Sequence, residues 1–157
     1  MIDKLVECVP GKRAVAVKTF PRSEVLFMDH FAGLPTVPGV LQIEMVLQTA
    51  AKAIKLERPS VLSLLGVVRC AKFFRRIEPG DHCRITAEIV RMRERYALQT
   101  GIIEVDGVRV ARVDVMVALV PSTARAVEDP LIEEWRSREA GRVEHDPLEA
   151  SAGPVVR

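Results

Sequence analysis

An apolar run in the middle of the chain constrains the fold more than any other feature. Between Pro38 and Leu56, apolar residues recur at spacings that cover every side of a helix. Pro38 suits the first helical position because its missing N–H has no partner to lose there. A helix that is apolar all round is expected in the middle of a protein. Four polar side chains make it unsuitable as a membrane span, namely Glu44, Gln48, Lys52 and Lys55.

Strand-like segments lie on both sides of this helix. Residues 61–68 are apolar enough to predict an inner strand, and the two-residue turn Asp106-Gly107 predicts a tight hairpin. The apolar alternation changes phase between Val110 and Ala111, which predicts a bulge. A curved antiparallel sheet wrapped around one long central helix, an α+β fold, accounts for the pattern. The other predicted strands cover residues 5–9, 14–20, 83–93, 96–105 and 108–120.

Glu44 is the unusual residue of the helix. No lysine or arginine lies three or four positions from it, and its only polar companion on that face is Gln48. Burial would raise the pKa of such a carboxyl and make it a candidate general acid. The alternative is that Glu44 faces solvent at a wet edge. A loop rich in glycine and proline precedes the helix and carries one histidine, His30.

These residues are part of a longer pattern. It resembles the signature of the 3-hydroxyacyl-[acyl-carrier-protein] dehydratases, hot-dog-fold enzymes of bacterial fatty-acid synthesis. The resemblance continues through residues 71–76, 79–81 and 105–107, and it covers roughly residues 1–120. Asp29 and Ala32 depart from it, and a carboxylate beside the histidine would raise the histidine pKa. The matching residues are His30, Phe31, Gly33, Pro35, Pro38, Gly39, Val40, Leu41, Glu44 and Gln48.

The resemblance implies removal of water from a (3R)-3-hydroxyacyl thioester of acyl carrier protein to give the trans-2-enoyl thioester. His30 would take the α-proton, and Glu44 would protonate the departing hydroxyl. An N–H at the positive end of the helix would polarise the thioester carbonyl. Gln48 is expected to hydrogen-bond to and orient either Glu44 or a water, with a solvent-facing amide as the alternative. The oxyanion and substrate-binding residues expected on this basis are Gly39, Val40, Gln48 and Phe31.

Assembly and partners also follow from the resemblance. In the family the histidine and the glutamate come from opposite subunits, which implies a homodimer, with a trimer of dimers as a larger alternative. No cofactor is implied, and the sequence has no metal-ligand spacing. A run of cations without an acid is expected either to receive acyl carrier protein and its phosphopantetheine phosphate or to form an ordinary solvated face. Its members are Arg69, Lys72, Arg75 and Arg76.

Composition excludes several other classes of protein. A net charge of +2 and 4% aromatic residues argue against a nucleic-acid-binding surface. No run of about 18 apolar residues predicts a membrane span. Three cysteines without a C-x-x-C pair argue against a disulfide framework or a zinc site, and favour a reducing cytoplasm. Cys8, Cys70 and Cys83 are therefore expected to behave as small buried apolar groups.

Residues 121–157 lie outside the resemblance, which divides the chain into a domain of residues 1–120 and a C-terminal extension. Asp129 can cap a short helix of about residues 130–140, with Pro130 at its first position and Gly141 as its end. The rest reads as a disordered tail.

Two other functions fit the same fold. A hot-dog acyl-thioester hydrolase would use Glu44 to activate water against the thioester carbonyl. A non-catalytic acyl-binding subunit would pair with an active homologue, and the departures at Asp29 and Ala32 keep this alternative open. Release of free thiol would distinguish the hydrolase from a dehydratase.

Overall fold

The computed structural model describes residues 1–23, 27, 33–122 and 129–143, with the backbone alone for 142 and 143. The chain divides into two compact units, Met1–Val127 and Glu128–Arg157. His30, Phe31 and the predicted tail beyond residue 143 lie outside the described residues. The elements are β1 (Lys4–Val9), β2 (Arg13–Thr19), α2 (Gly39–Glu57), β3 (Val61–Phe73), β4 (His82–Met92), β5 (Tyr96–Val105), β6 (Val108–Pro121) and α3 (Pro130–Val143).

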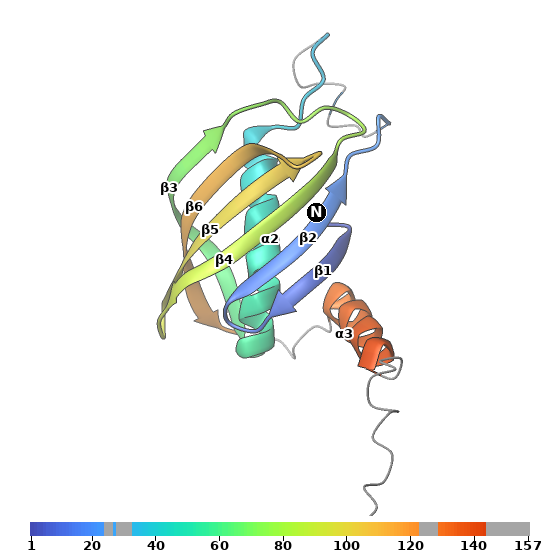
Figure 1. Cartoon of the computed structure of the whole chain (residues 1–157). Coiled ribbons are helices and arrows are strands. Elements are labelled where there is room, and N and C mark those ends of the chain that lie inside the picture. Colours follow the sequence, from blue (N-terminus) through green and yellow to red (C-terminus); the bar gives the residue numbers. More distant parts are fainter. Residues whose placement is uncertain (24–26, 28–32, 123–128, 144–157) are drawn as a thin grey trace, which may run out of the picture. The chain divides into compact units, whose positions relative to one another are not determined.

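The first unit is a six-stranded antiparallel sheet and the helix α2, which contacts the sheet along one face (Figure 1). The strand order is β1-β2-β4-β5-β6-β3, so the strand that follows α2 in the sequence lies at the far edge. Antiparallel pairing holds at every step of the sheet. The predicted α+β architecture, a curved sheet around one long helix, is confirmed.

A close approach between α2 and β5 sets the position of the helix. A Cβ atom on Gly101 would clash with the side chain of Val46, at 2.8 Å from Cγ2 and closer still to Cγ1. Only glycine leaves room for the Val46 side chain at this point of the sheet. Val46 and the alternate residues of β5 on either side of Gly101 are buried. The core between helix and sheet is therefore built around this contact.

The predicted bulge in β6 is confirmed. Ile103 pairs with Ala111 and Glu104 pairs with Arg109, which leaves Val110 as the extra residue. Val110 and Ala111 are both buried, although neighbours on a regular strand point to opposite faces. The bulge explains why the apolar alternation changes phase at this point.

The prediction that residues 61–68 form an inner strand is wrong. They belong to β3, a strand of 13 residues that pairs with β6 on one side only and forms an edge of the sheet. Its apolar content is therefore not explained by burial within one chain. The exposed fractions lie between 40% and 53% for Leu62, Leu64, Leu65, Val67 and Val68.

The expectation that α2 is buried on every side is also wrong for a single chain. The sheet covers one side of the helix, with Met45, Val46 and Ala50 fully buried. On the opposite side Val40 is 70% exposed, and Glu44 is only half-buried. No helix in the described part of the chain has both the length and the hydropathy that a membrane crossing requires.

The second unit contains α3, which begins at Pro130 as predicted. The N–H of Leu131 donates to Asp129 Oδ1 at 3.2 Å, and the N–H of Ile132 donates to the Asp129 carbonyl at 2.9 Å. Asp129 thus satisfies donors that the first turn of the helix leaves free. Gly141 was expected to end this helix and instead lies inside it.

Two of the three cysteines are buried thiols, as predicted. Burial, with a smaller contribution from the Glu7 carboxylate, raises the pKa of Cys8 to about 11. Burial, reinforced by Asp81, raises the pKa of Cys83 to about 12. Both groups therefore stay protonated and weakly nucleophilic at neutral pH. Cys70 is only half-buried, so the prediction is too strong for it.

The contact between Gly101 and Val46 generates a stability prediction. Gly101→Ala should lower the free energy of unfolding by about 1–3 kcal/mol, because the added methyl group overpacks the interface between α2 and β5. Adding Val46→Ala should recover part of this loss, so the double variant should be more stable than the sum of the single effects predicts. Urea unfolding of the four proteins measures the coupling.

Gly141→Ala is the matched control, because in the described part of the chain no atom beyond its own helical backbone and its two neighbours lies within 4 Å of the position that its Cβ would occupy. It should leave stability unchanged or raise it slightly, since glycine is a poor residue inside a helix. Strictly additive costs for Gly101→Ala and Val46→Ala would contradict the proposed packing.

Candidate active site

The first turn of α2 presents backbone donors. The Pro38 carbonyl accepts hydrogen bonds from the N–H groups of Leu41 at 3.0 Å and Gln42 at 3.3 Å. The N–H groups of Gly39 and Val40 come earlier in this turn, where a helix supplies no partner of its own. They lie at the positive end of the helix dipole. An oxygen that gains negative charge in a reaction would be stabilised there.

Gly39 also has a steric role. A Cβ atom at this position would lie 2.9 Å from Cζ of Phe73, the last residue of β3. Glycine is therefore needed for the Phe73 ring to pack against the first turn of the helix. Val40, the next residue, is predominantly exposed.

Glu44 and Gln48 lie on successive turns of the half-buried side of α2. Gln48 Nε2 donates a hydrogen bond of 2.7 Å to Glu44 Oε1. Of the two partners predicted for Gln48, Glu44 or a water, the structure shows Glu44. It occupies one carboxylate oxygen and limits the rotation of the side chain. Glu44 lies four residues after Val40, so both side chains share one face of the helix.

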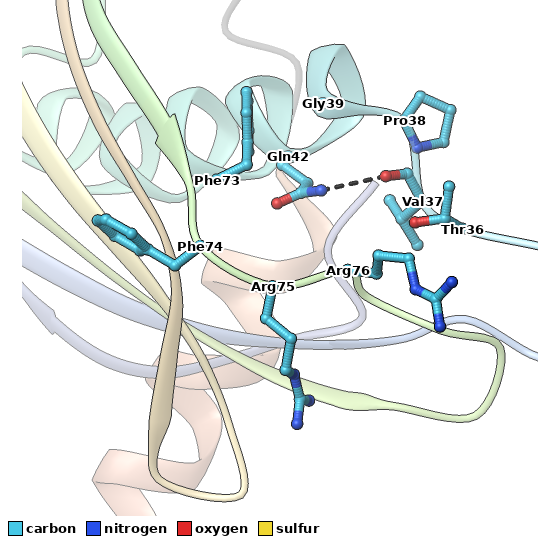
Figure 2. Close-up of a pocket in the computed structure, with 9 residues that line it drawn as sticks. All are labelled: Thr36, Val37, Pro38, Gly39, Gln42, Phe73, Phe74, Arg75 and Arg76. Atoms are coloured by element: carbon cyan, nitrogen blue, oxygen red, sulfur yellow. Dashed lines mark hydrogen bonds between the residues drawn. The ribbon is translucent and has the colours of Figure 1, made fainter.

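A cavity of about 380 Å³ opens beside the first turn of α2 (Figure 2). Residues 36–39 and Gln42 line one side, and residues 73–76 line the other. Arg75 and Arg76 line this second side, and their guanidinium groups are directed away from Gly39 (Figure 2). Arg75 Nη2 is 3.5 Å from Asp81 Oδ2, and Arg76 Nη2 is 2.7 Å from Glu78 Oε1. Both arginine side chains remain about half exposed.

The four predicted carrier-protein cations do not gather at this cavity. Only Arg75 and Arg76 line it. Arg69 is the extra residue of a bulge between Val68 and Cys70, and it lines a second cavity on the sheet. Lys72 pairs in register with Arg112 on β6. The bulge and the pleat of β3 separate these side chains.

Gln42 is a residue of this site that the sequence prediction missed. The residue is 3% exposed, its Nε2 donates to the Val37 carbonyl at 3.1 Å, and it lines the cavity. The signal in the sequence was a glutamine within the apolar run that follows Gly39 by three positions. The structure thus places Gly39, Gln42, Arg75 and Arg76 together. His30 and Phe31 are not placed by it.

Known proteins resemble this chain along most of its length. Residues 7–109 match the family described as ApeI-like, ApeI dehydratase. The 3-hydroxyacyl-[acyl-carrier-protein] dehydratase FabZ of Clostridium novyi is 36% identical over 121 residues, which are 76% of this chain and 85% of that protein. FabZ of Anoxybacillus flavithermus is 34% identical over 122 residues, with the same two coverages.

Solved structures share the fold. The dehydratase heterocomplex ApeI:P from Xenorhabdus doucetiae matches with a TM-score of 0.56 at 18% identity, over 69% of this chain and 88% of that one. The PaaI protein from the phenylacetic acid degradation operon of E. coli matches with a TM-score of 0.62 at 15% identity, over 76% and 80%. The hot-dog fold predicted from the sequence is therefore confirmed.

Proposed function

Because the chain belongs to the dehydratase family that includes the 3-hydroxyacyl-[acyl-carrier-protein] dehydratases, we propose that it removes water from a (3R)-3-hydroxyacyl thioester of acyl carrier protein in fatty-acid biosynthesis. The product is the trans-2-enoyl thioester. One observation within the structure carries the proposal: a carboxyl held by Gln48 lies shortly after a helix N-terminus whose first N–H groups have no partner within the helix.

The helix N-terminus and the Glu44 carboxyl suit the two halves of an elimination. A base removes the α-proton, and the electron pair moves toward the thioester carbonyl, where the Gly39 N–H stabilises the developing charge. The C–O bond at the β-carbon then breaks, and the hydroxyl leaves as water after receiving a proton from Glu44. The hydrogen bond from Gln48 occupies Glu44 Oε1, so Oε2 is the oxygen that carries this proton.

His30 is the base in this proposal. The spacing from His30 to Glu44 and Gln48 matches the family signature, which supports the assignment. A neutral imidazole can accept a proton from the α-carbon, as a general base does. Phe31, next to it, completes the acyl-binding surface together with Val40.

The proposed assembly is a homodimer that pairs two β3 strands across a twofold axis. An edge strand with unpaired N–H and C=O groups and exposed apolar side chains is suited to pair with a second strand. Leu65 and Val68 pair in register with the buried residues Val117 and Val115, so they extend the core face of the sheet beyond its own helix. A second subunit would cover them together with the half-buried side of α2.

The carrier protein would approach from the side of Arg75 and Arg76. These cations lie at the cavity next to Gly39, where the acyl arm has to enter if its carbonyl binds the helix N-terminus. Arg69 and Lys72, farther along β3, would contribute to a broader basic surface. Opposite charge on a partner accelerates association more than it strengthens the final complex. Free cysteines support a cytoplasmic setting for this reaction.

Glu44→Gln tests the chemistry. The variant keeps the size of the side chain but cannot donate a proton to the leaving hydroxyl, so the elimination rate should fall by about 10²–10⁴-fold. Rates are measured on 3-hydroxybutyryl and longer thioesters, with free thiol followed in parallel. Glu57→Gln, at the exposed far end of the same helix, is the control and should retain full activity.

Elimination by Glu44→Gln at the wild-type rate would remove Glu44 from the mechanism. Thiol release in place of enoyl formation would favour the hydrolase.

The shared site is tested by mixing two inactive proteins. If His30 and Glu44 act across the dimer interface, His30→Ala and Glu44→Gln subunits should restore activity when they exchange. Half of the randomly formed dimers are mixed, and each mixed dimer has one intact site, so about a quarter of wild-type activity should return. No recovery, with exchange confirmed by native mass spectrometry, would place both residues in one subunit.

The interface itself is tested by the double variant Leu65→Lys, Val68→Lys. Two lysines on the edge should prevent strand pairing and give a monomer in sedimentation velocity, with loss of activity. Val90→Lys replaces a similarly exposed apolar residue on β4 and should leave the dimer intact. A double variant that remains dimeric would locate the interface elsewhere.

A further inference from the structure

The cavity beside α2 contains an acceptor that nothing in the described residues satisfies. Gln42 Oε1 is buried and has no hydrogen-bond partner. A buried polar atom without a partner costs stability, so native structures rarely retain one without a reason. Gln42 also lines the cavity, so a molecule bound there lies next to its side chain.

The orientation of the Gln42 amide is determined by its surroundings. The Val37 carbonyl can only accept a hydrogen bond, so the atom facing it at 3.1 Å has to be the donor Nε2. Exchanging the nitrogen and the oxygen would place two acceptors against each other. Figure 2 shows the amide nitrogen directed at Val37 and the oxygen on the other side of the group. The unpartnered atom of Gln42 is therefore an acceptor, and any group that pairs with it has to be a donor.

The position of Gln42 relative to Gly39 indicates which group of a ligand would donate to Gln42 Oε1. Residues three apart on a helix lie above one another on one face, with Cβ positions about 5–6 Å apart. The Gln42 side chain reaches back toward Val37 and so passes the first turn. A thioester whose carbonyl binds the Gly39 N–H continues through its sulfur and two methylene groups to an amide N–H. This spacing is similar to one helical turn of about 5.4 Å.

We propose that Gln42 Oε1 accepts a hydrogen bond from the amide N–H of the pantetheine arm nearest to the thioester. This inference rests on the proposed function, since it takes the thioester carbonyl to lie at Gly39. The rest of the arm would leave past Arg75 and Arg76, whose half-exposed guanidinium groups, paired with Asp81 and Glu78, can bind its terminal phosphate outside the cavity. Gln42 is thus a positioning residue that aligns the thioester between the oxyanion donor and Glu44.

The test compares two small thioesters that differ in one group. One is the crotonyl thioester of N-acetylcysteamine, and the other is the crotonyl thioester of O-acetyl-mercaptoethanol, in which an ester oxygen replaces the amide N–H. Hydration of each is followed by loss of the enoyl absorbance. Binding of each is measured by calorimetry on the Glu44→Gln protein, where conversion is slow.

Wild-type protein should prefer the amide compound by about 5- to 50-fold in kcat/KM, and the Glu44→Gln protein should show the same preference in Kd. Adding Gln42→Met, which keeps the length of the side chain and removes its oxygen, should abolish the preference in both assays. Gln99→Met is the matched control. It removes another buried glutamine with an unpartnered amide, on β5, and should preserve the preference.

Three results would overturn the inference: no preference in the wild-type protein, a preference that survives Gln42→Met, or no binding of either compound. The first of these needs no variant at position 42, so the test does not depend on how Gln42→Met folds. A binding preference for the amide without hydration of either compound would instead contradict the proposed function and leave the role of Gln42 intact.

Discussion

The packing of α2 on the sheet is the constraint on which the rest of the structure depends. Gly101 lets the helix approach so closely that Val46 occupies the space of a missing side chain. The helix has apolar residues on every side, however, and one sheet can bury only one of them. The uncovered side of α2 and the edge strand β3 therefore both expose apolar side chains. In the proposed dimer the second subunit buries both surfaces.

This constraint also determines where chemistry can occur. The buried side of α2 anchors the helix, so its first turn and its half-buried side are held rigidly while remaining accessible. Gly39 and Glu44 belong to these two accessible parts, and Gln48 restricts Glu44 further. Groups on a well-packed helix keep their geometry better than groups on a loop. In this proposal the base comes from the other subunit.

The elements that depend on local pattern could be predicted from the sequence. The strands, the turn at Asp106-Gly107, the bulge at Val110 and the hydrogen bond between Glu44 and Gln48 all follow from neighbouring residues. Apolar content alone could not show whether β3 is covered by its own chain or by another, which is why it was predicted as an inner strand.

Gln42, the site residue that the sequence prediction missed, could not be found for a related reason. Gln42 depends on a contact with Val37 and on the distant segment 73–76, and neither is visible in a local pattern. The separation of Arg69 from Arg75 and Arg76 could not be predicted either, because a bulge changes which face a side chain takes. His30 was placed by its motif, and its position stays a prediction.

The pairing of β3 with β6 has a consequence for the order of folding. The two strands are separated in sequence by the whole of β4 and β5, so β3 leaves the ribosome well before its partner exists. During that interval a long apolar segment is present with neither of its edges paired. Contacts between distant segments form late, because closing the intervening loop costs entropy. β3, the strand that would join two finished subunits, is therefore also the part of the nascent chain most prone to associate wrongly with other chains. Chaperone binding matters most for this segment.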